Sequence, residues 1–124
     1  MVQAILLVMV GGAFGSAARY LITHLSSELS EHHGFPFGTL VVNVFGSLAV
    51  GYILTWSADH SHDRWRLLAA TGFCGGFTTF STFSYETMAY WHSRRLLLLA
   101  LNIALNNAVS LCAVMIGISL HNSN

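Results

Sequence analysis

Charge is what this sequence has least of. Its 124 residues include no lysine, five arginines and five acidic residues, and charged residues make up 8% of the chain. Soluble domains carry about a quarter. With no basic run, the chain has nothing to neutralise a row of phosphates, which argues against nucleic-acid binding. Together with 54% hydrophobic residues, the low charge predicts an integral membrane protein surrounded by lipid.

Cysteine and proline are also scarce. Cys74 and Cys112 both lie in apolar stretches, so we expect small buried side chains rather than a disulfide or a zinc site. The loop at residues 59–63, Asp-His-Ser-His-Asp, could chelate a metal, but a solvated loop is the favoured interpretation. No basic region precedes the first apolar run, so a signal peptide is not expected.

Four windows are long and apolar enough to cross a bilayer, which takes about 20 residues. They cover about residues 2–24, 37–57, 65–91 and 96–120, and the second follows the only proline, Pro36. The loops between them are too short for a second domain. We therefore predict one membrane domain, residues 1–124, of the all-α class with four transmembrane helices.

The arginines give no consistent orientation. Arginines near span ends stay on the cytoplasmic side. One pair, at residues 64 and 66, precedes the third window, and the other, at 94 and 95, follows it, so the two pairs favour opposite orientations. We therefore expect insertion in both orientations and an antiparallel, dual-topology homodimer. Four helices alone enclose little space, so a second copy is also expected to complete any pathway.

Small residues recur one helical turn apart, a pattern that lets membrane helices approach closely. The pairs are Gly11 with Gly15, Gly12 with Ser16, Ser47 with Gly51, and Gly72 with Gly76. Packing within one chain and packing between two copies both remain open for each pair.

The third window contains an unusual segment at residues 72–84, GFCGGFTTFSTFS. Adjacent glycines at 75 and 76, followed by β-branched threonines, disfavour a continuous helix, so we predict a break near Gly75 to Thr79. Non-helical backbone inside a bilayer must be buried in protein or line a cavity. Carbonyl groups released there could bind a small cation such as sodium. A kink capped by hydroxyl groups, without an ion, is the alternative.

Beyond the break, helical spacing places Phe80 and Phe83 one turn apart, with Ser81 and Ser84 on the adjacent face. Phenylalanines at this spacing are usually core residues. The interleaved hydroxyl groups favour a site instead, because positive ring edges and hydroxyl donors together can solvate an anion without a full charge. This chemistry suits a small, strongly hydrated anion.

Other polar residues lie inside the apolar windows. Glu86 is the only carboxylate within one, and a charge costs about 2.5 to 3.5 kcal/mol at the bilayer centre, which favours a function over an interfacial position. The NH2 group of Asn43 could donate to an anion or join two helices. The fourth window carries a stripe at four-residue spacing, Asn102, Asn106 and Ser110. This stripe either continues a polar track or holds helices together.

These motifs resemble the Fluc or CrcB family of fluoride channels over essentially the whole chain. The matching blocks are Gly11-Gly12 through Arg19-Tyr20, then Gly38-Thr39-Leu40 with Val42-Asn43 and Gly46, then residues 72–83 with Glu86-Thr87. The resemblance implies a dual-topology homodimer in the bacterial inner membrane. Its two antiparallel pores would export fluoride passively and relieve fluoride toxicity.

The resemblance also implies roles for single positions. Phe80 and Phe83 are similar to the pore phenylalanines and Asn43 to the pore asparagine, while Gly75 and Thr78 match the positions whose carbonyls hold a structural sodium ion at the dimer centre. Ser81, Ser84, Glu86 and Ser110 are similar to the family's polar track. The complete predicted ion pathway is Arg19, Asn43, Thr79, Phe80, Ser81, Phe83, Ser84, Glu86, Asn106 and Ser110.

Two other functions suit a small membrane protein of this kind. A small multidrug-type, proton-coupled transporter needs a membrane carboxylate, which that family carries in its first span; here the first window has none. A non-transporting assembly subunit would use the buried polar residues only to hold helices together. An enzyme is not expected, because no histidine or aspartate lies in the interior of a window, where it could activate a serine; His24 is at the end of the first.

Overall fold

The computed structural model describes residues 1–60 and 62–123, without the side chains of residues 59 and 60, and all its regular elements are helices. The elements, in chain order, are α1 Val2–Leu25, α2 Ser27–His33, α3 Phe37–His60, α4 Asp63–Trp65, the π-helix η1 Arg66–Cys74, α5 Gly75–Phe77, α6 Phe80–His92 and α7 Leu96–Asn122. The loop considered as a chelating site, residues 59–63, falls partly outside the described residues.

Within the described part of the chain, three helices are long and apolar enough to cross a membrane. They are α1, residues 37–58 of α3, and α7. Most side chains in these segments are not buried against the rest of the chain, as expected when lipid covers them. The chain is therefore a multi-pass membrane protein. The third predicted window does not form one such helix, because it is divided among α4, η1, α5 and α6.

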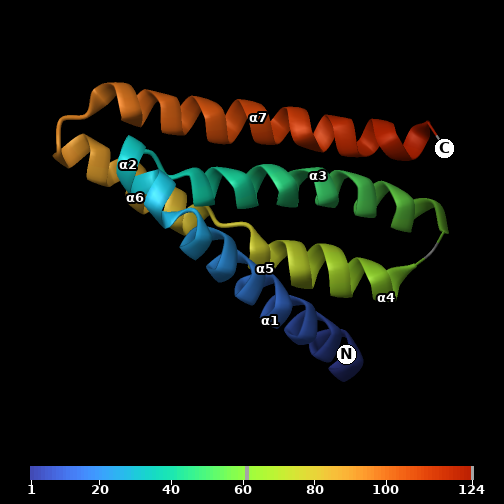
Figure 1. The fold of residues 1–124 in the computed structure, drawn as a ribbon. Coiled ribbons are helices and arrows are strands. Elements are labelled where there is room, and N and C mark those ends of the chain that lie inside the picture. Colours follow the sequence, from blue (N-terminus) through green and yellow to red (C-terminus); the bar gives the residue numbers. More distant parts are fainter. Residues whose placement is uncertain (61, 124) are drawn as a thin grey trace.

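The elements run back and forth along a common direction (Figure 1). The chain passes through α1, returns along α3, runs back through the segment from α4 to α6, and returns along α7, so that both termini lie at the same end. The α3 helix starts directly after Pro36, whose carbonyl accepts the Leu40 N–H at 3.2 Å. The short helix α2 lies where the sequence predicted only a loop. It ends at Gly34, which adopts a left-handed φ of 67°.

Glycines bring the backbones of α1 and the η1–α5 segment into direct contact. A Cβ atom at Gly11 would lie 2.0 Å from the Leu68 carbonyl oxygen, and one at Gly15 would lie 2.1 Å from that of Phe73. From the other side, a Cβ at Gly76 would lie 2.6 Å from the Gly12 oxygen. These glycines therefore pack within one chain, one of the two possibilities that the sequence left open.

The α3 and α7 helices lie side by side along their length (Figure 1). Glycines again allow the approach, since a Cβ at Gly51 would lie 2.4 Å from the Val114 oxygen and one at Gly117 would lie 2.2 Å from the Leu48 oxygen. Val42 of α3 is fully buried. Both helix pairs thus position backbone and small side chains around the segment that joins α5 to α6.

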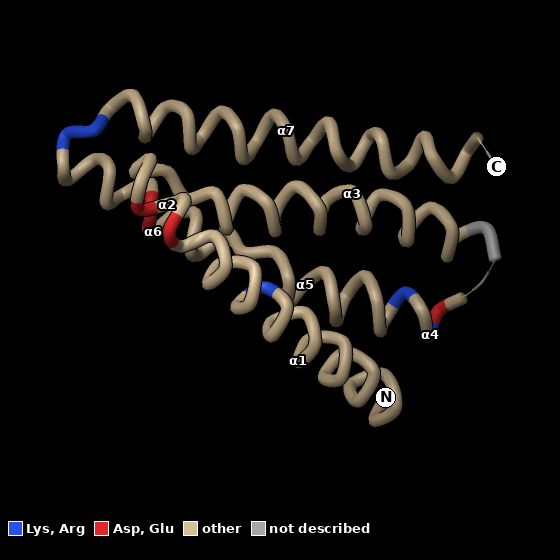
Figure 2. Tube along the Cα trace, in the orientation of Figure 1, with Lys and Arg blue, Asp and Glu red and all other residues tan. Residues whose placement is uncertain are grey.

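Arginines lie at both ends of the bundle (Figure 2). Those of the α6–α7 turn are at one end, and those of α4 and the start of η1 are at the other, near the two termini. The two arginine pairs therefore lie at opposite ends of the bundle, where they favour opposite orientations in the membrane.

Candidate functional site

The helix of the third segment is interrupted at two threonines. The α5 helix ends at Phe77, and α6 begins at Phe80; Thr78 (φ −80°, ψ 159°) and Thr79 (φ −150°, ψ 119°) between them are extended. Gly75, with φ −63° and ψ −38°, is helical. The glycines therefore do not form the interruption, contrary to the reasoning from their low helix propensity. Gly76 instead allows the close contact with α1.

Asn43 of α3 binds the extended backbone on both sides of Thr79. The Thr79 N–H donates to Asn43 Oδ1 at 2.8 Å, and Asn43 Nδ2 donates to the Thr79 carbonyl at 3.2 Å. One side-chain amide thus replaces the two backbone partners that Thr79 would have in a helix. Gly46, one turn further along α3, provides room, because a Cβ there would lie 2.2 Å from Thr78 Cγ2.

The interruption releases the backbone carbonyl groups that precede it, and those of Gly75 and Thr78 are among them. In a continuing helix the Thr79 N–H would bind the Gly75 oxygen, and the Thr82 N–H would bind the Thr78 oxygen. Here the first N–H donates to Asn43, and the second donates to Thr79 Oγ1 at 3.2 Å, which caps the start of α6. The carbonyls of Gly75 and Thr78 therefore lose their helical donors. They are the two carbonyls predicted to bind sodium, and oxygen ligands of this type suit that ion.

A groove of about 290 Å³, which we call the amide groove, lies beside the interruption. Neutral side chains from α3, α6 and α7 surround it together with the two extended threonines. Its lining residues are Asn43, Gly46, Ser47, Val50, Thr78, Thr79, Phe80, Phe83, Asn106, Asn107, Ser110 and Val114. The fold therefore gathers much of the predicted pathway around one space that no charged side chain lines.

Within the amide groove, the two rings and one hydroxyl group differ in exposure. The centroids of Phe80 and Phe83 are 5.6 Å apart, with the rings tilted by 48°. Phe83 is buried, whereas Phe80 is 78% exposed in the single chain. The Ser110 Oγ is buried and has no hydrogen-bond partner among the described residues. An unsatisfied buried hydroxyl is unfavourable in a packed core, so its position in a groove points to a ligand.

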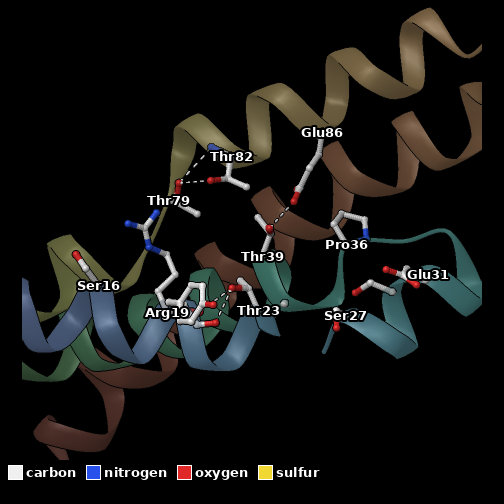
Figure 3. A pocket seen from close by; sticks show the side chains of 13 residues that line it. Ser16, Arg19, Thr23, Ser27, Glu31, Pro36, Thr39, Thr79, Thr82 and Glu86 are labelled. Atoms are coloured by element: carbon white, nitrogen blue, oxygen red, sulfur yellow. Dashed lines mark hydrogen bonds between the residues drawn. The ribbon is translucent and has the colours of Figure 1, made fainter. Parts of the chain in front are cut away.

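A second cavity of about 510 Å³, which we call the hydroxyl pocket, also adjoins the interruption, at Thr79 (Figure 3). Hydroxyl groups from α1, α2, α3 and α6 surround one arginine and two glutamates. Its lining residues are Ser16, Arg19, Tyr20, Thr23, Ser27, Ser30, Glu31, Pro36, Gly38, Thr39, Thr79, Thr82 and Glu86. Thr79 lines both cavities and is 7% exposed. It therefore stands between them.

Glu86 extends from α6 toward α3 in the hydroxyl pocket (Figure 3). Its Oε1 accepts a 2.6 Å hydrogen bond from the Thr39 hydroxyl group. Its Oε2 is buried and has no hydrogen-bond partner among the described residues. A carboxylate held this way can accept a proton or a hydrogen bond from a molecule or ion that enters the pocket.

Three predicted residues line neither cavity. Ser84 donates its hydroxyl hydrogen to the Phe80 carbonyl of its own helix at 2.8 Å. Ser81 is exposed, and its Oγ lies 3.3 Å from Thr79 Oγ1. Gly75 is exposed in the single chain. The prediction that both serines line one track with Glu86 and Ser110 therefore does not match the cavities of one chain.

Sequence reasoning also missed two features of the site. Thr39 was not among the predicted pathway residues, although Thr39, Asn43 and Ser47 recur at the four-residue spacing of one helix face. For the NH2 group of Asn43 the sequence left open donation to an anion and a hydrogen bond between helices. In the structure it donates to the Thr79 carbonyl and, at 2.9 Å, to Asn106 Oδ1, so both hydrogens are engaged.

Known proteins are similar to this chain in sequence over most of its length. Residues 6–118 match the family described as CrcB-like protein, Camphor Resistance (CrcB). A protein of Thermococcus kodakarensis, named fluoride-specific ion channel FluC, is 44% identical over 114 residues, which cover 90% of this chain and 89% of the relative.

Two further relatives carry the same name. One, from Koribacter versatilis, is 37% identical over 116 residues, covering 92% of this chain and 91% of the relative. The other, from Clostridium novyi, is 42% identical over 109 residues, covering 86% and 84%. The similarity therefore extends across nearly the full length of these proteins.

Proposed function

Since this chain belongs to the CrcB-like protein family, we propose that it is a fluoride channel, the function named for its relatives. The observation that carries the proposal is the amide groove, where amide, hydroxyl and phenyl groups surround a space without a charged lining residue. The names of the relatives describe ion channels rather than enzymes. They give no support to a multidrug transporter or an assembly subunit.

The chemistry of the amide groove suits an anion that must move on. A full positive charge would hold a small anion tightly, because Coulomb attraction is strong where water is excluded. Neutral donors and positive ring edges provide a weaker field. Conduction needs binding that is favourable enough for entry and weak enough for release. Ser110, with its unpartnered hydroxyl group, and the edge of Phe80 are the groups that a fluoride ion would contact.

We further propose that the segment from α4 to α6 is a fourth, interrupted membrane span, and that the channel is an antiparallel homodimer in the bacterial inner membrane, exporting fluoride passively. Supporting this, η1 and α5 lie against α1 and α3, and α6 lies against α7. The ring of Phe80 and the released carbonyls at Gly75 and Thr78 border exposed surface. A second copy would cover them.

Dual insertion makes a direct prediction about topology. A reporter fused after Asn124 should be found on both sides of the membrane in comparable amounts, because the two arginine pairs oppose each other. Replacement of Arg94 and Arg95 by glutamine should shift the population toward the orientation that keeps Arg64 and Arg66 in the cytoplasm. A reporter confined to one side in the unmodified chain would rule out dual topology.

Sodium is the cofactor that we propose for the released carbonyls of Gly75 and Thr78. Replacing sodium with the bulky cation N-methylglucamine should lower the melting temperature of the purified protein, since a bound ion stabilises by about 2.7 kcal/mol at a hundredfold excess over its dissociation constant. Adding sodium back should restore the melting temperature saturably. Equal melting temperatures in the two salts would contradict a bound sodium ion.

The experiment that tests the proposed function is efflux from liposomes. The purified protein should release trapped fluoride, followed with a fluoride electrode, and should not release chloride under the same gradient. Absence of fluoride efflux, or equal release of both ions, would refute the proposal.

A further inference from the structure

Four polar side chains form a continuous chain of hydrogen bonds from α3 through α7 to α6. Asn43 Nδ2 donates to Asn106 Oδ1 at 2.9 Å, Asn106 Nδ2 donates to Asn102 Oδ1 at 2.9 Å, and Asn102 Nδ2 donates to Thr87 Oγ1 at 3.0 Å. Asn102 is fully buried and Asn106 is 6% exposed. Asn102 and Thr87 line neither cavity. Asn102 and Thr87 can therefore influence an ion in either cavity only through the residues that they contact.

Backbone groups fix the directions of the hydrogen bonds in this series at three places. The Phe83 carbonyl orients the Thr87 hydroxyl group, the Asn102 carbonyl accepts from Asn106 Nδ2 at 3.1 Å, and the Thr79 backbone orients the Asn43 amide. The Thr87 hydroxyl group donates to the Phe83 carbonyl at 2.7 Å, so its oxygen is left to accept from Asn102. This fixes the NH2 group of Asn102 toward Thr87 and its oxygen toward Asn106. Asn106 in turn must present its NH2 group to Asn102 and its oxygen to Asn43.

The orientation reached at Asn43 is the one that the interruption requires. With its NH2 group toward Asn106, Asn43 points its oxygen at the Thr79 N–H. If the amide were reversed, its NH2 group would face that N–H, and its oxygen would face both the Thr79 carbonyl and the Asn106 oxygen. Two hydrogen bonds to the extended backbone would then be lost, and each unsatisfied buried group is costly.

We propose that Thr87, Asn102 and Asn106 are positioning residues, which fix the Asn43 amide in the orientation that holds Thr79 extended and so sets the start of α6 and its two phenylalanines. The proposal deepens, and rests on, the proposed channel function. It assigns to Asn102, and to Asn106 in addition to its place in the lining of the amide groove, the role of holding Thr79 extended.

Thr87 offers the sharpest test, because it lies outside both cavities. Thr87→Val removes the hydroxyl group and keeps the shape, whereas Thr87→Ser keeps the hydroxyl group. The matched control is Thr55→Val, since Thr55 makes the same bond to its own helix, at 2.8 Å to the Gly51 carbonyl, and has no amide neighbour in such a chain. All variants are compared as full-length protein in the same detergent and liposomes.

We expect fluoride efflux to be about fivefold slower in Thr87→Val, because that variant loses the net free energy of about one hydrogen bond. The rates of Thr87→Ser and Thr55→Val should stay within about twofold of the unmodified rate. Hydrogen exchange supplies a readout that does not depend on transport. The amides of residues 78–80 should exchange about fivefold faster in Thr87→Val alone, with no change where α1 contacts η1.

Several results would overturn the inference. Equal exchange at residues 78–80 in Thr87→Val and Thr87→Ser would show that Thr87 does not position the interruption. Faster exchange throughout α6 and α7 would indicate general loosening instead. If the unmodified protein shows no fluoride efflux, the proposed function fails, but the exchange measurement still decides whether the positioning chain exists.

Discussion

Fluoride efflux should fall to the leak of empty liposomes when Asn43 is replaced by aspartate. The carboxylate has nearly the shape of the amide but no N–H, so it cannot donate to the Thr79 carbonyl or to Asn106 Oδ1, its present acceptors. It also places a negative charge at the amide groove. At about 4 Å and an effective dielectric constant of about 20, like charges repel by about 4 kcal/mol, which corresponds to about a thousandfold in rate.

Phe80→Ile belongs to the same experiment, because isoleucine retains bulk but has no positive ring edge. We expect at least a tenfold slower fluoride efflux, from the loss of about 1.4 kcal/mol or more of ion stabilisation. Phe45→Ile is the matched control, since Phe45 is an exposed phenylalanine of α3 that lines neither cavity. Undiminished fluoride efflux in Asn43→Asp or Phe80→Ile would remove the amide groove from the ion pathway.

Adding a single methyl group at Gly11 should be the most damaging small substitution in the chain. In Gly11→Ala the Cβ would lie 2.0 Å from the Leu68 oxygen and 2.8 Å from the Phe73 nitrogen, both backbone atoms that cannot turn aside. Overpacking of this kind costs about 1 to 3 kcal/mol or more. This exceeds the gain of about 1 kcal/mol from the higher helix propensity of alanine. The fraction of monodisperse protein after extraction should fall sharply.

The neighbouring glycine provides the control. A Cβ at Gly12 meets only the Gly72 oxygen, at the ordinary distance of 3.8 Å, so Gly12→Ala should leave the melting temperature unchanged or raise it. Measuring both variants by size-exclusion chromatography and thermal melting distinguishes packing within the chain from packing between copies. If Gly12→Ala alone disrupted the assembly, the contact between α1 and η1 would not be the one that limits stability.

The positions of the long helices followed from the sequence because the thickness of a bilayer fixes how many apolar residues a span needs. The windows at 2–24, 37–57 and 96–120 differ from α1, α3 and α7 by no more than three residues at either end. The helix α2 was not predicted, since six polar residues and one leucine between two spans carry no apolar periodicity. The π-helical turns of η1 also have no signal in the composition.

For the site, local spacing predicted which residues would share a helix face but not what their polar atoms would bind. Phe80, Phe83 and Ser110 meet Asn43 as expected in the amide groove. That the Asn43 amide is saturated by Thr79 and Asn106 could not be predicted, because both partners are more than 30 residues away in sequence. The interruption lies at Thr78 and Thr79, within the range predicted for it, but Gly75 and Gly76 are helical. The contact between Gly76 and α1 could not be read from the sequence, because it is visible only in three dimensions.

Thr79 gives the site a property that neither cavity has alone. Its side chain forms part of the wall of the amide groove and of the hydroxyl pocket, and its backbone is bound by Asn43. Any displacement of this one residue must change the dimensions of the two chambers at the same moment. A movement of Thr79 would therefore open or close the amide groove and the hydroxyl pocket together. An ion in either cavity would be affected by the same movement.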